Sequence, residues 1–78
     1  MTTTYASCTT TPAKVAAASA DSGEIMHVEC PDQDSAELWE IRLLGLLDES
    51  DSASPAVGPI EVWGDLDGSP VRIHIIHG

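Results

Sequence analysis

Residues 59–77, PIEVWGDLDGSPVRIHIIH, constrain the fold more than any other part of the chain. Asp67-Gly68 is a strong sequence pattern for a two-residue type I′ hairpin turn. The resulting register puts apolar pairs on one face and polar or aromatic pairs on the other. These pairs are Val62 with Ile73, Ile60 with Ile75, Trp63 with Arg72, and Glu61 with His74. Trp63 and Arg72 are also expected to form a cation–π contact.

A strand and a helix precede this hairpin. Residues 24–30, EIMHVEC, alternate in polarity, which predicts a strand whose Met26, Val28 and Cys30 face the core. Residues 34–49 have helical periodicity, and Asp34 with Glu37 fits the positions of a capping box. The side chains expected to face the sheet are Ala36, Trp39, Leu43, Leu46 and Leu47. By composition, residues 50–58 are expected to form a loop.

The N-terminal residues 1–23 are expected to form an arm. Residues 2–11 are rich in threonine, which suits an edge strand or an extended segment. An alanine-rich stretch follows, with Thr11 as N-cap, Pro12 at the first helical position and Gly23 as the stop. Its small side chains predict a weakly anchored helix that buries little.

Together these elements predict an α+β domain over residues 24–78, with a small antiparallel sheet and the helix 34–49 on one face. The chain order strand, helix, strand, strand gives a sheet in which the last strand lies between the other two. The arm could add a strand at the edge. Half of a ferredoxin-like fold has the same connectivity, but shared architecture does not indicate function.

The chain is short and strongly acidic, with 78 residues and 13 Asp and Glu against 3 Lys and Arg. Its hydrophobic fraction of 42% favours a folded domain over an acidic disordered tail. A formal charge of −10 disfavours direct contact with nucleic acids or anionic membranes and favours basic protein surfaces. No membrane-spanning run or secretory leader is found in the sequence, so a cytoplasmic protein is expected.

The sequence has no catalytic motif, and we expect no enzyme activity, metal or cofactor. The two cysteines, Cys8 and Cys30, are interpreted as free thiols, with a single disulfide left open. Residues 65–69, DLDGS, resemble part of a calcium loop but lack its closing glutamate, so a hairpin turn is favoured. The histidines at positions 27, 74 and 77 are interpreted as strand residues, because 74 and 77 should point to opposite faces.

The most unusual feature is the density of carboxylates between residues 21 and 51, where ten of the thirteen occur and Arg42 is the only cation. Asp48, Glu49 and Asp51 lie at the C-terminal end of the expected helix, where they oppose its dipole. Aliphatic side chains lie among these charges on the helix, as in an interface. The predicted partner-binding residues are Asp32, Asp34, Glu37, Glu40, Ile41, Leu44, Asp48, Glu49 and Asp51.

In its size, acidity and lack of catalytic motifs, the chain loosely resembles small phage-encoded inhibitors of bacterial defence, of the anti-CRISPR type. The resemblance is one of general character and involves no residue-level motif. It implies an inhibitor in the host cytoplasm that imitates DNA on a basic surface of a nucleoprotein complex. The alternative is a structural or accessory homodimer whose acidic surface only keeps it solvated.

Overall fold

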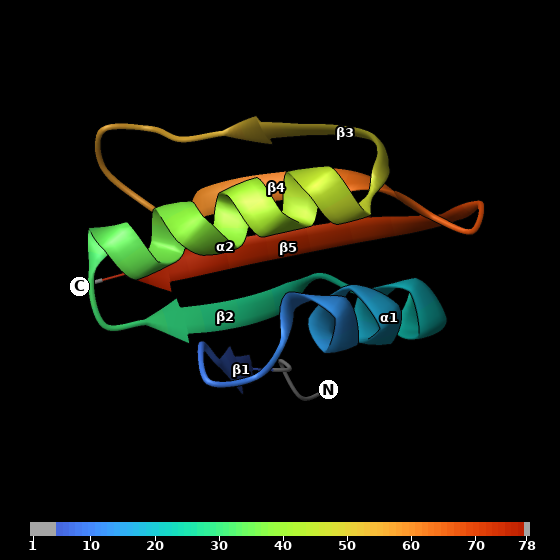
Figure 1. Cartoon of the computed structure of the whole chain (residues 1–78), viewed down its shortest axis with the longest axis horizontal. Helices are drawn as coiled ribbons and strands as arrows, with labels where there is room; N and C mark the ends of the chain where they lie inside the picture. Colours follow the sequence, from blue (N-terminus) through green and yellow to red (C-terminus); the bar gives the residue numbers. More distant parts are fainter. Residues whose placement is uncertain (1–4, 78) are drawn as a thin grey trace.

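The computed structural model describes residues 5–77 as a two-layer α+β fold (Figure 1). In chain order the elements are β1 (Tyr5–Ser7), α1 (Pro12–Ser22), β2 (Met26–Cys30), α2 (Gln33–Leu46), β3 (Asp48–Ala53), β4 (Ile60–Leu66) and β5 (Ser69–His77). The strands form one sheet in the order β1-β2-β5-β4-β3. Both helices pack on the same face of this sheet and contact each other, which leaves the opposite face open.

The α+β class and the order β2-β5-β4 are confirmed, but the sheet is mixed, not antiparallel. β1 runs parallel to β2, and β2 runs parallel to β5. Only β3, β4 and β5 are antiparallel neighbours. The prediction was wrong because it missed β3, and one additional strand reverses the direction in which β4 and β5 run relative to β2.

The hairpin of β4 and β5 forms in the predicted register, with all four predicted pairs in place. Asp67 and Gly68 both have positive φ, of 52° and 83°, as a type I′ turn requires. Trp63 pairs with Arg72, but the two side chains make no cation–π contact within the described residues. Five β-branched side chains of these two strands are buried under the helices: Ile60, Val62, Val71, Ile73 and Ile75.

Helix α1 has the predicted ends but is anchored more firmly than predicted. Thr11 accepts a hydrogen bond from the Lys14 amide, and Gly23 ends the helix with φ of 74°. Val15, Ala16 and Ser19 are buried. Small side chains let the helix approach the sheet closely, so residues 5–22 belong to the same core as the rest. Residues 1–4 of the expected arm lie outside the described residues.

Helix α2 covers Gln33–Leu46, which is shorter at its C-terminal end than the predicted 34–49. Its N-cap is Asp32, which accepts a 2.8 Å hydrogen bond from the Ser35 amide, so the capping box predicted at Asp34 and Glu37 is wrong. The predicted core face is confirmed at four positions: Ala36, Trp39, Leu43 and Leu47. Leu46 is an exception, because 39% of it is exposed.

Strand β3 occupies residues expected to end the helix (48–49) and to begin a loop (50–53). Asp and Ser disfavour strands, but pairing with β4 stabilises this segment despite its composition. A register shift lies between Asp48 and Asp51, and Glu49 there has φ of 50°. Gly64 on β4 makes this approach possible. A Cβ added to Gly64 would lie 3.0 Å from the Asp48 carbonyl oxygen and 3.1 Å from Ser50 Cα.

Neither helix in the described part of the chain is long and apolar enough to cross a membrane.

Candidate functional site

The predicted partner-binding residues lie on α2, on its N-cap and on β3. Seven of the nine are exposed: Asp32, Asp34, Glu37, Ile41, Asp48, Glu49 and Asp51. Glu40 is half-buried, and so is Leu44, which packs against the hydrophobic core. Leu44 therefore contributes to folding, and only Ile41, with 65% of its surface exposed, remains as a free apolar anchor.

The flank of α2 that carries Glu37, Glu40 and Leu44 turns toward β3. These three positions are spaced by three and four residues, so they share one side of the helix. The Ser50 hydroxyl of β3 donates a 2.8 Å hydrogen bond to the Leu44 carbonyl and ties the end of α2 to this strand. On the other side of α2, the Trp39 indole N–H donates to the Cys8 carbonyl at 3.3 Å.

We call the carboxylates of this flank and of β3 the acidic edge: Glu37, Glu40, Asp48, Glu49 and Asp51. β3 is the last strand of the sheet, so its outer backbone groups have no strand partner within residues 5–77. Asp51 pairs with Trp63, whose side chain lies on the open face, so Asp51 is directed to that face. The acidic edge therefore extends from the helical layer around β3 toward the open face of the sheet.

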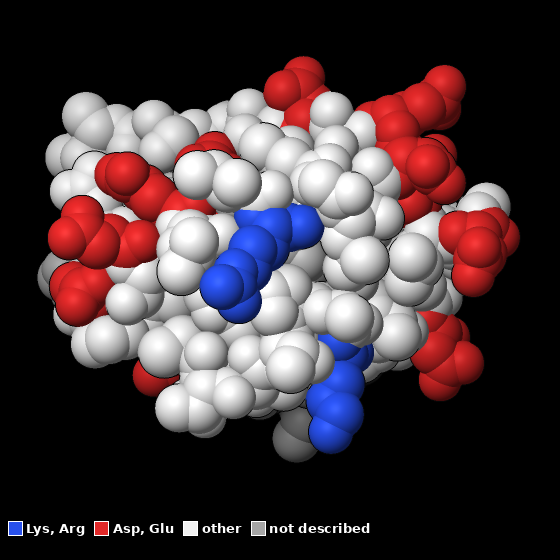
Figure 2. Space-filling model, viewed as in Figure 1, with Lys and Arg blue, Asp and Glu red and all other residues white. Residues whose placement is uncertain are grey.

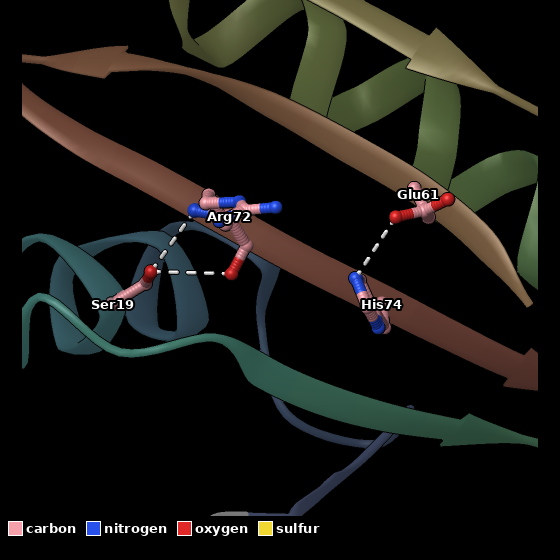
Figure 3. A network of polar contacts seen from close by, with 4 residues as sticks. All are labelled: Ser19, Glu61, Arg72 and His74. Carbon is pink, nitrogen blue, oxygen red and sulfur yellow. Dashed lines mark hydrogen bonds and ion pairs between the residues drawn. The ribbon is translucent and has the colours of Figure 1, made fainter.

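The carboxylates of the protein are largely unneutralised. Among residues 5–77 the only close contact between a carboxylate and a basic side chain joins His74 Nε2 to Glu61 Oε1 at 3.2 Å (Figure 3). Lys14, Arg42 and Arg72 are exposed and form no such pair with a carboxylate. Figure 2 shows acidic side chains gathered at both ends of the helical face, with basic side chains nearer its middle.

Two acidic side chains show opposite effects of their positions. The pKa of Asp32 is held below its ordinary value by the hydrogen bonds from Ser35 at the start of α2, although Asp32 is exposed. Asp48 pairs with Asp65 across β3 and β4, and like charges in this position destabilise a sheet. The acidic edge therefore opposes folding at one position, while the N-cap supports it at another.

The open face of the sheet forms a second polar surface that sequence reasoning did not assemble. His27 and His74 pair across β2 and β5, and their rings lie 5.3 Å apart. Beside them is a groove of about 400 Å³ whose lining includes Trp63, Arg72 and Glu61. The pairing of Glu61 with His74 could be predicted from the hairpin, but the parallel contact with His27 depends on a long-range register that has no local sequence pattern.

The candidate chemical sites have simple structural roles. Asp65 belongs to β4 and Asp67 to the hairpin turn, rather than to a calcium loop. His74 lies on the open face, whereas His77 pairs with Cys30 on the core side, so the expected separation is confirmed. Within residues 5–77, no three His, Cys, Asp or Glu side chains are grouped in a way that could hold a metal ion.

A hydroxyl group supports the central strand from the helical layer. The Ser19 side chain of α1 is buried, accepts from the Arg72 amide at 3.1 Å and lies 3.2 Å from the Arg72 carbonyl oxygen (Figure 3). It also reaches the Glu24 carbonyl at 2.9 Å. β2 begins opposite Ile73, so Arg72 has no partner on β2. Ser19 takes the place of that strand partner.

Comparison of the chain with protein-family models, with curated proteins and with solved structures finds no match.

Proposed function

We propose that this protein is a non-enzymatic inhibitor that covers a basic, nucleic-acid-binding surface of a defence nucleoprotein complex and blocks access of DNA. One observation carries the proposal. Thirteen carboxylates lie on a small domain, all of them exposed or half-exposed, and none is paired with Lys or Arg within residues 5–77. Such a surface attracts a partner lined with Lys and Arg at long range.

The acidic edge is the part of the surface best suited to this contact. It combines carboxylates from α2 with those of an edge strand whose outer backbone groups can pair with an added strand. Two copies of β3 would bring Asp48, Glu49 and Asp51 against the same charges, so self-pairing is opposed. A strand or loop rich in Lys and Arg meets no such repulsion. Ile41 on the adjoining helix face supplies apolar contact.

A mobility-shift experiment tests this function. Purified, guide-loaded CRISPR effector complexes of several types are incubated with labelled target DNA and increasing amounts of the protein. We expect at least one effector type to lose DNA binding, and the inhibition to weaken steeply as salt rises from about 0.05 to 0.5 M, because salt screens exposed charges. If no effector type loses DNA binding, the proposed function is wrong.

A pair of charge-matched variants identifies the surface. Asp48→Lys with Glu49→Lys reverses two charges of the acidic edge, and Asp21→Lys with Glu24→Lys reverses two exposed charges elsewhere. We expect the first variant to inhibit at least tenfold less well and the second to change inhibition by less than threefold. Equal losses in both variants would mean that only net charge matters. If neither variant lost inhibition, the acidic edge would not be part of the contact.

The second candidate function is a structural or accessory homodimer. Its supporting observation is the set of exposed apolar side chains on α2, which we call the apolar strip: Leu38, Ile41 and Leu46 are 49%, 65% and 39% exposed and together span about 140° of the helix surface. In this case the carboxylates only solvate the surface, and dimerisation should strengthen with salt because two acidic copies repel each other less. Sedimentation at 0.1 and 2 M KCl distinguishes the two functions, and Ile41→Lys should abolish the dimer if the strip forms its interface.

A further inference from the structure

The two cysteines, 22 positions apart in sequence, are neighbours in the fold. Ser7 of β1 pairs with Glu29 of β2, and the Cys8 amide donates to the Glu29 carbonyl at 3.1 Å. Cys8 therefore continues the parallel ladder by one residue and lies beside Cys30. Neighbouring strands are about 4.8 Å apart, and disulfides form between Cα atoms about 4.4 to 6.8 Å apart.

Both cysteine side chains lie on the same face of the sheet. Cys30 is buried in the core cluster, and Cys8 packs against that cluster while remaining half-exposed. Ser7, between Ala6 and Cys8, is exposed, as strand alternation requires. The two sulfur atoms are therefore directed to the same side, which is the arrangement that a disulfide between adjacent strands needs.

The two thiols differ in accessibility. A hollow of about 500 Å³ runs along Cys8 and Cys30 and is lined also by Pro31 at the end of β2. Burial raises the pKa of Cys30 to about 11, and the neighbouring Cys8 thiol contributes to this rise. The half-exposed Cys8 is consequently the thiol that a reagent reaches first, and Cys30 is the second thiol of the pair.

We propose that Cys8 and Cys30 form a reversible disulfide, with a low-molecular-weight disulfide as oxidant, and that this bond fastens β1 to the sheet. The Cys8 thiolate attacks the oxidant, breaks its S–S bond, and releases one thiol. Cys30 then gives its proton to water, and its sulfur attacks Cys8 Sγ and displaces the second thiol. Two protein thiols are oxidised to one disulfide, and the oxidant is reduced to two thiols.

The bond would close a loop from residue 8 to residue 30 that contains the whole of α1. β1 has only three residues and lies at the edge of the sheet. A covalent link at its end would hold β1 at the edge of the folded sheet. It would also restrict the conformations of the β1-α1 segment in the unfolded chain. A loop of this size predicts a rise of about 10 °C or more in Tm on oxidation.

Thiol–disulfide equilibrium of the full chain tests the proposal. The protein is equilibrated at pH 8 with mixtures of oxidised and reduced dithiothreitol, both uncharged, in native buffer and in 8 M urea. Remaining thiols are then alkylated and the products are identified by intact mass. We expect the effective concentration of the two thiols to be at least tenfold higher in native buffer than in urea, because the fold holds them together.

Two variants and a thermal scan complete the experiment. Cys8→Ser and Cys30→Ala should each prevent the intramolecular bond, and neither should show the rise in Tm that oxidation gives the natural chain. An effective concentration in native buffer equal to or below that in urea would overturn the proposal. Disulfide-linked dimers through Cys8 in place of the internal bond would overturn it as well.

Discussion

Replacing Gly64 by alanine tests the approach of β3 to β4 most directly. The new Cβ would lie 3.0 Å from the Asp48 carbonyl oxygen, 3.0 Å from Leu47 Cβ and 3.1 Å from Ser50 Cα. Two of these atoms belong to the backbone, so the contacts cannot be relieved by turning a flexible side chain. Overpacking of this kind costs about 1 to 3 kcal/mol. For a domain of this size that corresponds to a fall in Tm of roughly 5 to 20 °C.

Gly45→Ala is the matched control, because the substitution is the same and the surroundings are open. An added Cβ at Gly45 meets no atom within 4 Å, and the residue lies on the exposed side of α2. Alanine in a helix is favoured over glycine by up to about 1 kcal/mol, so this variant should be more stable than the natural chain. Urea unfolding followed by tryptophan fluorescence measures both changes.

The two glycine variants should thus move stability in opposite directions. An unchanged or raised midpoint for Gly64→Ala would show that β3 does not pass this close to β4, and the placement of the acidic edge would fail with it. A loss in both variants of similar size would indicate a general intolerance of the fold to added side chains. Only the opposite signs support the close approach.

Further substitutions test the packing and capping of the helices. Ser19→Ala should lower the free energy of unfolding by about 1 to 3 kcal/mol, because a buried β5 amide loses its acceptor, and thermal unfolding measures this loss. Asp32→Asn should lower Tm at pH 7, and the difference from the natural chain should close as the pH falls below 3.8, because the folded-state pKa of Asp32 is depressed and its stabilisation is lost on protonation. Ile41→Lys should change stability by less than about 0.5 kcal/mol, whereas Leu44→Lys should be markedly destabilising in urea unfolding, and equal effects would contradict their different burial.

Local patterns predicted those elements whose stabilising contacts are close in sequence. The Asp67-Gly68 turn fixed the register of β4 and β5, and Thr11 with Gly23 fixed the ends of α1. Strand β3 could not be predicted this way, because its residues favour a loop and its stabilisation comes from pairing with β4. Because the prediction missed β3, it made β5 antiparallel to β2, whereas the two strands are parallel.

Long-range contacts also decided where the predicted partner-binding residues lie. Periodicity alone placed Leu44 beside Ile41 as an anchor, but β3 folds back on α2 and leaves Leu44 packed against the core. Asp51 belongs to the open face only because the register of β3 directs it there. The adjacency of Cys8 and Cys30 depends on the parallel register of β1 and β2, which no short motif encodes.

The stability of a variant with a changed acidic edge also distinguishes the two proposed functions. Asp48 lies opposite Asp65, and Asp48 and Glu49 follow the C-terminal end of α2, where negative charge opposes the helix dipole. Replacing both by lysine should therefore raise the Tm of the free protein at low salt, with a gain that shrinks as salt screens the charges. If this change raises stability and weakens inhibition, the two carboxylates serve binding to the partner. If the change raises stability at low salt but lowers solubility in 2 M KCl, and the protein has no effect on any effector, the carboxylates serve to solvate the surface.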